Sequence, residues 1–146
     1  MGVIIHIPDV EKALSELARI VRPGGKRALY ITNQAALDHK IEWLARRLLG
    51  RPSTRMERRA MGEGCWYEMN GERLWLWRIN VGTLRRYLEA HGFRLRHHRI
   101  GEFTNIQRRT RGLLRSLLLR LNHLCFRLRF PPTHAAATLL VFEKAA

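Results

Sequence analysis

The 146-residue sequence has little cysteine, little proline and no long apolar run. Its two cysteines, Cys65 and Cys125, cannot build a disulfide scaffold, and neither belongs to a CxxC pair. No run approaches the ~18 apolar residues of a spanning helix, and the N-terminus has neither the basic region nor the cleavage site of a signal peptide. His97 and His98 alternate on an expected strand, and neither cysteine has candidate ligands nearby. We therefore expect a reduced, soluble, cytoplasmic protein without a metal site.

Acidic residues and lysine are also scarce. Lysine and arginine together number 27 against 12 acidic residues, which gives a net charge of +15, and only four of the 27 are lysine. Guanidinium groups match phosphate geometry, so this charge is compatible with nucleic acid, anionic lipid or a phosphorylated substrate. A GC-rich coding bias would explain the same excess without any function. Composition alone leaves both explanations open.

The first segment, residues 1–33, has the pattern of a βαβ unit. The apolar run at residues 3–6 predicts a short strand, and Asp9 is a suitable N-cap for the helix that follows. Residues 23–25, Pro-Gly-Gly, end that helix because proline cannot continue it and glycine accepts a left-handed cap. Residues 27–32 then predict a second strand.

The second segment, residues 34–79, is expected to hold a helix, a basic loop and a hairpin. The apolar stripe of the helix consists of Leu37, Ile41, Leu44 and Leu48. Trp43 lies on the opposite, polar face beside His39 and Arg46. Residues 51–64 are basic and aperiodic, which predicts a mobile loop.

A hairpin is the clearest local signal in the chain. The pair Asn70-Gly71 separates two aromatic-rich runs, and such a pair is typical of two-residue turns in which both positions need a positive φ. In the resulting register Trp66 faces Trp75 and Glu68 faces Arg73, both favourable cross-strand pairs. We expect the hairpin tryptophans to pack in the core.

The third segment, residues 80–146, predicts a helix capped by Asn80, a strand from Phe93, a basic amphipathic helix over 111–129 and a closing strand over 137–142. The apolar stripe of the amphipathic helix consists of Leu113, Leu114, Leu117, Leu121, Leu124 and Leu128. This stripe could pack on the domain, which we favour, or lie on an anionic membrane. Nucleic-acid binding is disfavoured because Phe126 is the only aromatic interleaved with the arginines.

Several motifs together resemble a known family. The sequence of residues 3–33, VIIHIPDVEKALSELARIVRPGGKRALYITN, is similar to the middle of class I S-adenosylmethionine-dependent methyltransferases of the ubiquinone/menaquinone-biosynthesis-like type. Residues 84–93 are similar to the family's helix and Gly-Phe entry into strand 6, and residues 139–144 resemble strand 7. The family's sheet order is 3-2-1-4-5-7-6. The resemblance therefore implies one partial α/β domain over 1–146, with an incomplete Rossmann-like sheet (4-5-7-6), flanking helices, the hairpin and the basic helix.

The resemblance also implies what this chain lacks. The family's glycine-rich GxGxG loop and the acidic residues after strands 2 and 3 hold the cofactor, and no counterpart of them is found here. Gly24 and Gly25 follow a helix and cannot replace that loop, while Met1 falls inside strand 4. We therefore expect the C-terminal half of a methyltransferase. The intact protein would methylate a small-molecule or lipid-like acceptor, whereas this chain alone would bind S-adenosylmethionine weakly or not at all.

The resemblance places four candidate site residues near the methyl-transfer centre. His6 ends strand 4, where ligands of open α/β sheets lie, and is the candidate catalytic base; a histidine bonded to backbone is the alternative. Thr32 and Asn33 end strand 5 at the same rim and are candidate substrate contacts, although we favour Asn33 as a helix cap. Trp43 is a candidate lid contact or a half-exposed aromatic. The competing function is a non-enzymatic basic module that binds anionic membrane or nucleic acid.

Overall fold

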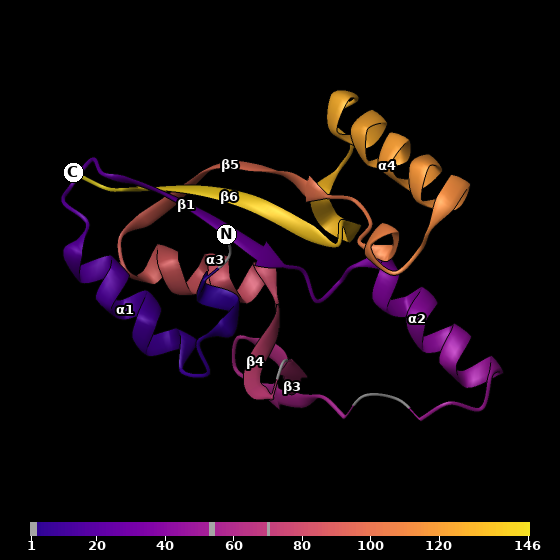
Figure 1. The fold of residues 1–146 in the computed structure, drawn as a ribbon. Helices are drawn as coiled ribbons and strands as arrows, with labels where there is room; N and C mark the ends of the chain where they lie inside the picture. Colours follow the sequence, from indigo (N-terminus) through magenta and orange to yellow (C-terminus); the bar gives the residue numbers. More distant parts are fainter. Residues whose placement is uncertain (1–2, 53–54, 70) are drawn as a thin grey trace.

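The computed structural model describes residues 3–52, 55–69 and 71–146. Within these residues the protein is mixed α/β, with four α-helices and two antiparallel sheets of three strands each (Figure 1). The helices are α1 (Val10–Ile20), α2 (Leu37–Leu48), α3 (Val81–Ala90) and α4 (Gly112–Arg127). The expected α/β class is confirmed, and the strands are divided between two sheets.

The first sheet consists of β1 (Lys26–Thr32), β5 (Phe93–Glu102) and β6 (Ala137–Lys144) in the order β1-β6-β5. The central strand β6 runs antiparallel to both neighbours. All three strands were expected from the sequence, but the four-stranded Rossmann-like sheet that the resemblance implies is not seen among the described residues. Helices α1 and α3 lie on one side of this sheet (Figure 1).

The expectation of a strand at residues 3–6 is wrong. Residues Val3–His6 form a 3-10 helix, η1, so that the segment up to residue 33 is not a βαβ unit; Met1 lies outside the described residues. The end of β1 is met instead by the end of a hairpin strand, through a parallel bridge between Asn33 and Ile79 and a hydrogen bond of 3.0 Å from Gln34 N to Ile79 O. The η1 helix packs against that hairpin strand and β1.

The second sheet contains the expected hairpin. It consists of β2 (Glu57–Arg59), β3 (Gly62–Met69) and β4 (Glu72–Ile79). In β3 and β4 the pairs Trp66–Trp75 and Glu68–Arg73 stand opposite each other, which confirms the expected register. Gly71 has a φ of +80°, as the turn requires, and Asn70 lies outside the described residues.

The expectation of a mobile loop over 51–64 is wrong for residues 57–64. Residues 57–59 pair with 62–64 as strands, and Arg58 forms an ion pair of 3.3 Å with Glu63 across them. This strand is exposed on both faces and therefore carries no apolar alternation for a sequence pattern to reveal. Residues 53–54 lie outside the described part of the chain.

The main core joins the two sheets to α1 and α3. Its largest fully buried side chains are those of Trp75, Trp77, Phe93, Phe142 and Leu14. Two of the hairpin tryptophans thus pack as expected, whereas Trp66 is half exposed. Both expected caps are present: Asp9 Oδ1 accepts from Lys12 N at 3.1 Å, and Asn80 Oδ1 accepts from Thr83 N at 3.0 Å.

Helices α2 and α4 lie at the other end of the molecule, away from α1 (Figure 1). Their leucine stripes are exposed, so the favoured packing of the 111–129 stripe on the domain is wrong. The buried side chains are Asp38 in α2 and Cys125 in α4. Among the described helices, none combines the length and apolar character needed to cross a membrane.

Candidate functional site

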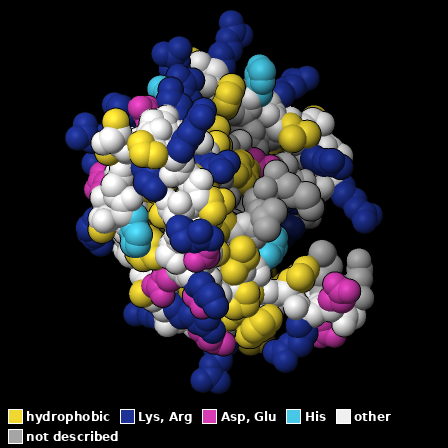
Figure 2. All heavy atoms as spheres, turned by 90° about the vertical axis from the view of Figure 1, so that its left-hand side faces the viewer, with side chains coloured by type: hydrophobic (Ala, Val, Ile, Leu, Met, Phe, Trp, Pro, Cys, Tyr) yellow, Lys and Arg dark blue, Asp and Glu magenta, His cyan; other side chains and the backbone are white. Residues whose placement is uncertain are grey.

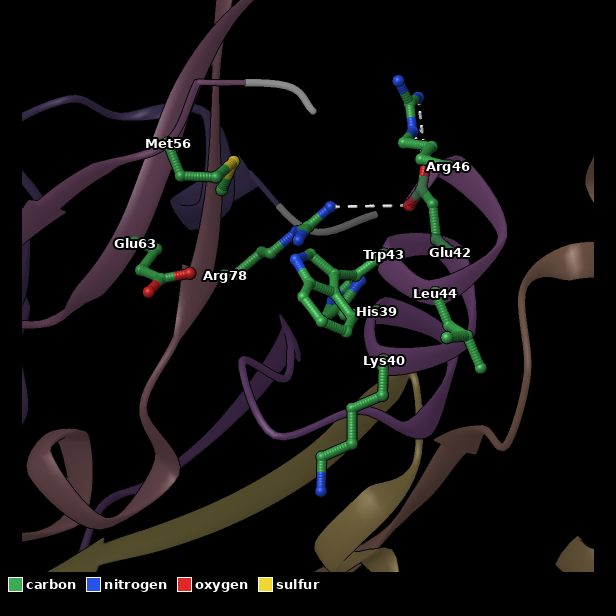
Figure 3. A pocket seen from close by; sticks show the side chains of 9 residues that line it. All are labelled: His39, Lys40, Glu42, Trp43, Leu44, Arg46, Met56, Glu63 and Arg78. Atoms are coloured by element: carbon green, nitrogen blue, oxygen red, sulfur yellow. Dashed lines mark hydrogen bonds and ion pairs between the residues drawn. The ribbon is translucent and has the colours of Figure 1, made fainter. Parts of the chain in front are cut away.

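A cavity of about 580 Å³ lies between α2 and the second sheet (Figure 3). Most of its lining belongs to α2, and β3, β4 and the segment before β2 supply the rest. The lining residues are His39, Lys40, Glu42, Trp43, Leu44, Arg46, Met56, Glu63 and Arg78. Its volume is within the range of small-molecule sites.

Helix α2 is held over this cavity by its first turn. Asp38 is buried, and its Oδ2 accepts hydrogen bonds from Thr104 Oγ1 at 3.1 Å and from Asn105 N at 2.6 Å. A buried carboxylate is stable only when such donors satisfy it. These bonds tie α2, which follows β1, to the loop after β5, and they fix the helix wall of the cavity.

Glu42 is the carboxylate that pairs with the arginines around the cavity. Its carboxylate contacts Arg46 of the same helix at 3.1 Å, Arg78 of β4 at 3.7 Å and Arg109 at 2.8 Å. Figure 3 shows Arg78 reaching from β4 toward Glu42. Burial alone would raise the pKa of Glu42, but the hydrogen bonds and charges of Arg109 and Arg46 outweigh it and lower the pKa. One carboxylate thus holds three guanidinium groups from three segments.

His39 is the neutral polar group of the site. Burial, followed by the nearby charge of Arg78, lowers its pKa to about 4. Its Nε2 is buried and has no hydrogen-bond partner within the described residues. Because this atom is buried, a ligand in the cavity would reach it only after the imidazole or a neighbouring side chain moves.

Trp43 gives the cavity an aromatic wall. Its side chain is 53% exposed, and the Arg47 guanidinium stacks over its ring at 5.3 Å from the centroid. Leu44 and Met56 add apolar surface. Together with His39, these groups suit a ligand that has an apolar body and a polar group.

The four candidate residues are not gathered at one place. Trp43 lines the α2 cavity, whereas Asn33 lines a different cavity of about 550 Å³ next to the start of α3. His6 and Thr32 line neither of these two cavities. The His6 ring is exposed, and its Nδ1 lies 3.0 Å from the Trp75 carbonyl oxygen.

Asn33 does not cap α2, which corrects the favoured expectation. The N-cap of α2 is Ala36, and no side chain caps the helix there. Instead, Asn33 Nδ2 donates to the carbonyls of Thr133 at 2.8 Å and Ala135 at 3.1 Å, and its Oδ1 accepts from Ala35 N at 3.0 Å. Asn33 thereby joins the end of β1 to the segment before β6, which leaves its substrate role a prediction.

Sequence reasoning missed most of the cavity. The helical spacing of His39, Trp43 and Arg46 did predict a shared face, but nothing indicated that this face borders a cavity. Glu63 and Arg78 face each other in the predicted hairpin, but the hairpin is brought to this place by the contact of β4 with β1, which is long-range. In the described part of the chain, no cluster of three His, Cys, Asp or Glu residues is arranged to hold a metal ion.

The comparisons with known proteins leave the family open. No protein-family model matches the chain, and no curated protein is significantly similar to it. The described residues also do not fit an S-adenosylmethionine site of the kind that the resemblance implies. Gly24 and Gly25 come between α1 and β1, not between a strand and a following helix.

Proposed function

We propose that this chain is the acceptor-binding half of an S-adenosylmethionine-dependent methyltransferase and binds its acceptor in the α2 cavity. The observation that carries the proposal is the order β1-β6-β5 of the three strands, which is the order of strands 5, 7 and 6 in the family that the sequence resembles. Strands that follow one another in the chain are usually neighbours in the sheet, so a last strand inserted between two earlier ones is a less common arrangement. In this proposal S-adenosylmethionine is bound by the other half of the methyltransferase and not by this chain.

The position of the cavity supports the same function. The resemblance places the acceptor near the end of β1, and α2 begins at Leu37, shortly after β1 ends at Thr32. Trp43 and Met56 offer apolar surface to the acceptor, and the polar side chains that line the same cavity offer it hydrogen bonds. The acceptor is accordingly a largely apolar molecule with a polar group.

His6 is the proposed base. Its Nδ1 is engaged by the Trp75 carbonyl, which fixes Nδ1 as the protonated nitrogen and leaves Nε2 free to accept a proton. His6 does not line the α2 cavity, so this role requires that the acceptor extend from the cavity to His6. Replacement of His6 by asparagine, whose amide nitrogen can take the place of Nδ1, would keep the bond to Trp75 and remove the base.

The first test is the DNA sequence upstream of the Met1 codon. The proposal expects an open reading frame that encodes a strand followed by a glycine-rich loop. The longer chain is then expected to bind S-adenosylmethionine in calorimetry, and the 146-residue chain is not. A stop codon directly upstream, with no such loop in any frame, would overturn the proposal.

The second test locates the acceptor. In the longer chain, with methyl transfer from labelled S-adenosylmethionine to an apolar acceptor library as the assay, Trp43→Ala is expected to lower kcat/KM about tenfold. Trp66→Ala is the matched control, because Trp66 is also half exposed but does not line the cavity. Equal losses in the two variants would place the acceptor elsewhere.

A further inference from the structure

Helix α4 presents an uncovered stripe of leucines. The stripe recurs at spacings of three and four residues, and its members are between 40% and 77% exposed. They are Leu113, Leu114, Leu117, Leu121, Leu124 and Leu128. Single exposed leucines are common on soluble proteins, but a contiguous stripe along a whole helix marks an interaction surface.

The orientation of α4 is fixed by a different face of the helix. Asn122 Oδ1 accepts from Thr104 N at 3.0 Å, and Asn122 Nδ2 donates to Thr104 O at 2.9 Å. Cys125 is buried on the same face, and Leu118 is half buried there. The leucine stripe is therefore held outward by specific bonds and is not exposed because the helix is loose.

Charge on α4 and its flanks has a single sign. The segment 111–129 contains no acidic residue, and its arginines are Arg111, Arg115, Arg120, Arg127 and Arg129. No acidic side chain of the described residues lies within ion-pair distance of these five guanidinium groups. At helical spacing Arg120 and Arg127 border the stripe next to Leu113 and Leu124.

The exposed leucines and the unpaired arginines of α4 together favour one kind of partner. A second copy of α4 would set positive charge against positive charge, with no carboxylate on the helix to compensate. A single-stranded nucleic acid would engage arginines and stacking aromatics and would leave the leucines in water. An anionic bilayer accepts both groups, since its acyl boundary takes leucines and its phosphates take guanidinium groups.

We propose that α4 is an interfacial helix that docks the protein on anionic membranes, with the leucine stripe in the acyl boundary and Arg120 and Arg127 on lipid phosphates. The rest of the surface carries basic side chains too, but on the face seen in Figure 2 they are spread widely. On α4 they stand next to the exposed leucines. This inference does not depend on the methyltransferase proposal.

Vesicle flotation of the purified chain tests the proposal. We expect the chain to float with vesicles of phosphatidylcholine and phosphatidylglycerol and to remain in solution with phosphatidylcholine alone. Leu117→Ser is expected to weaken binding about tenfold, which corresponds to a loss of about 1.4 kcal/mol, because the leucine no longer enters the acyl boundary. Arg120→Gln combined with Arg127→Gln should weaken binding to anionic vesicles and reduce its salt dependence.

Leu119→Ser is the matched control. Leu119 belongs to the same helix and is 47% exposed, close to the 51% of Leu117, but it lies outside the stripe. The substitution should therefore leave vesicle binding unchanged. Circular dichroism of both variants checks that α4 stays folded.

Four outcomes would overturn the proposal. They are no flotation with anionic vesicles, equal losses for Leu117→Ser and Leu119→Ser, a dimer in light scattering that Leu117→Ser dissociates, and binding of an oligonucleotide in preference to vesicles. The third outcome would assign the stripe to a second copy of the chain. The fourth would assign the arginines to nucleic acid.

Discussion

At the scale of single residues, the α2 cavity depends on a few side chains whose surroundings differ from what their sequence neighbours suggest. His39 lies on the polar face of a helix, where a histidine is ordinarily solvated. Here burial, followed by the nearby charge of Arg78, lowers its pKa to about 4. The residue type was visible in the sequence, whereas the charge of Arg78 comes from a strand almost forty positions away.

His39 should make stability depend on pH. Because its pKa is lower in the folded chain than the ordinary value of 6.5, protonation favours the unfolded chain. Its contribution is fully present above about pH 6.5 and is lost as the pH falls toward 4. Between pH 7 and 5 the wild type should lose about 1 kcal/mol more stability than His39→Gln, after allowance for partial solvent screening. Urea unfolding of both proteins across this range measures the difference, and parallel curves would contradict the prediction.

Gly64 should not tolerate a side chain. A Cβ at this position would collide with the ring of Trp75, which is 1% exposed and cannot move aside. Gly64→Ala is therefore expected to destabilise the protein by about 2–3 kcal/mol. Gly82→Ala is the control, because Gly82 lies exposed in the first turn of α3 and alanine favours helices there. Thermal unfolding should show a lower Tm for the first variant only.

At the scale of elements, local signals predicted local structure well. Asp9 and Asn80 cap their helices, and the Asn70-Gly71 pair marked a hairpin in the correct register, because these signals act over a few residues. The failures at residues 3–6 and at the exposed stripes of α2 and α4 depended on distant partners. Residues 3–6 form a 3-10 helix since the hairpin, not this segment, meets the end of β1. The stripes of α2 and α4 have an amphipathic pattern, but the pattern cannot reveal whether anything covers them.

Removal of the Asp38 carboxylate should loosen α2. The substitution Asp38→Ala leaves Thr104 Oγ1 and Asn105 N without their acceptor in a buried place, which should cost about 2–3 kcal/mol in the free energy of unfolding. Asp9→Ala removes only an exposed helix cap and should cost about 1 kcal/mol. Denaturant titrations compare the two variants. Similar losses would mean that the Asp38 bonds contribute no more than an ordinary cap.

At the scale of the whole molecule, positive charge opposes folding. The net charge is +15, and the ion pairs seen in the structure are mostly exposed and contribute little each. Salt screens the repulsion among the unpaired arginines over distances beyond about 10 Å. Stability should accordingly increase with sodium chloride concentration.

Thermal unfolding across a salt series measures this effect. We expect Tm to rise by several degrees between about 20 mM and 300 mM sodium chloride, with most of the rise at the low end, where the Debye length is longest. Replacement of chloride by a larger monovalent anion separates screening from specific anion binding. A Tm that falls as salt is added would mean that attractive pairs outweigh the net repulsion.

The side chains of β4 alternate between the core and the cavity. Trp75, Trp77 and Ile79 point into the core, while Arg78, between the last two, points into the cavity. The chemistry of the cavity is thus separable from the stability of the fold, although the same few residues of backbone carry both. Exchange of Arg78 for a neutral side chain would remove one partner of Glu42 and change which molecules the cavity accepts, without repacking the interior. This makes the position a natural point for divergence and for redesign.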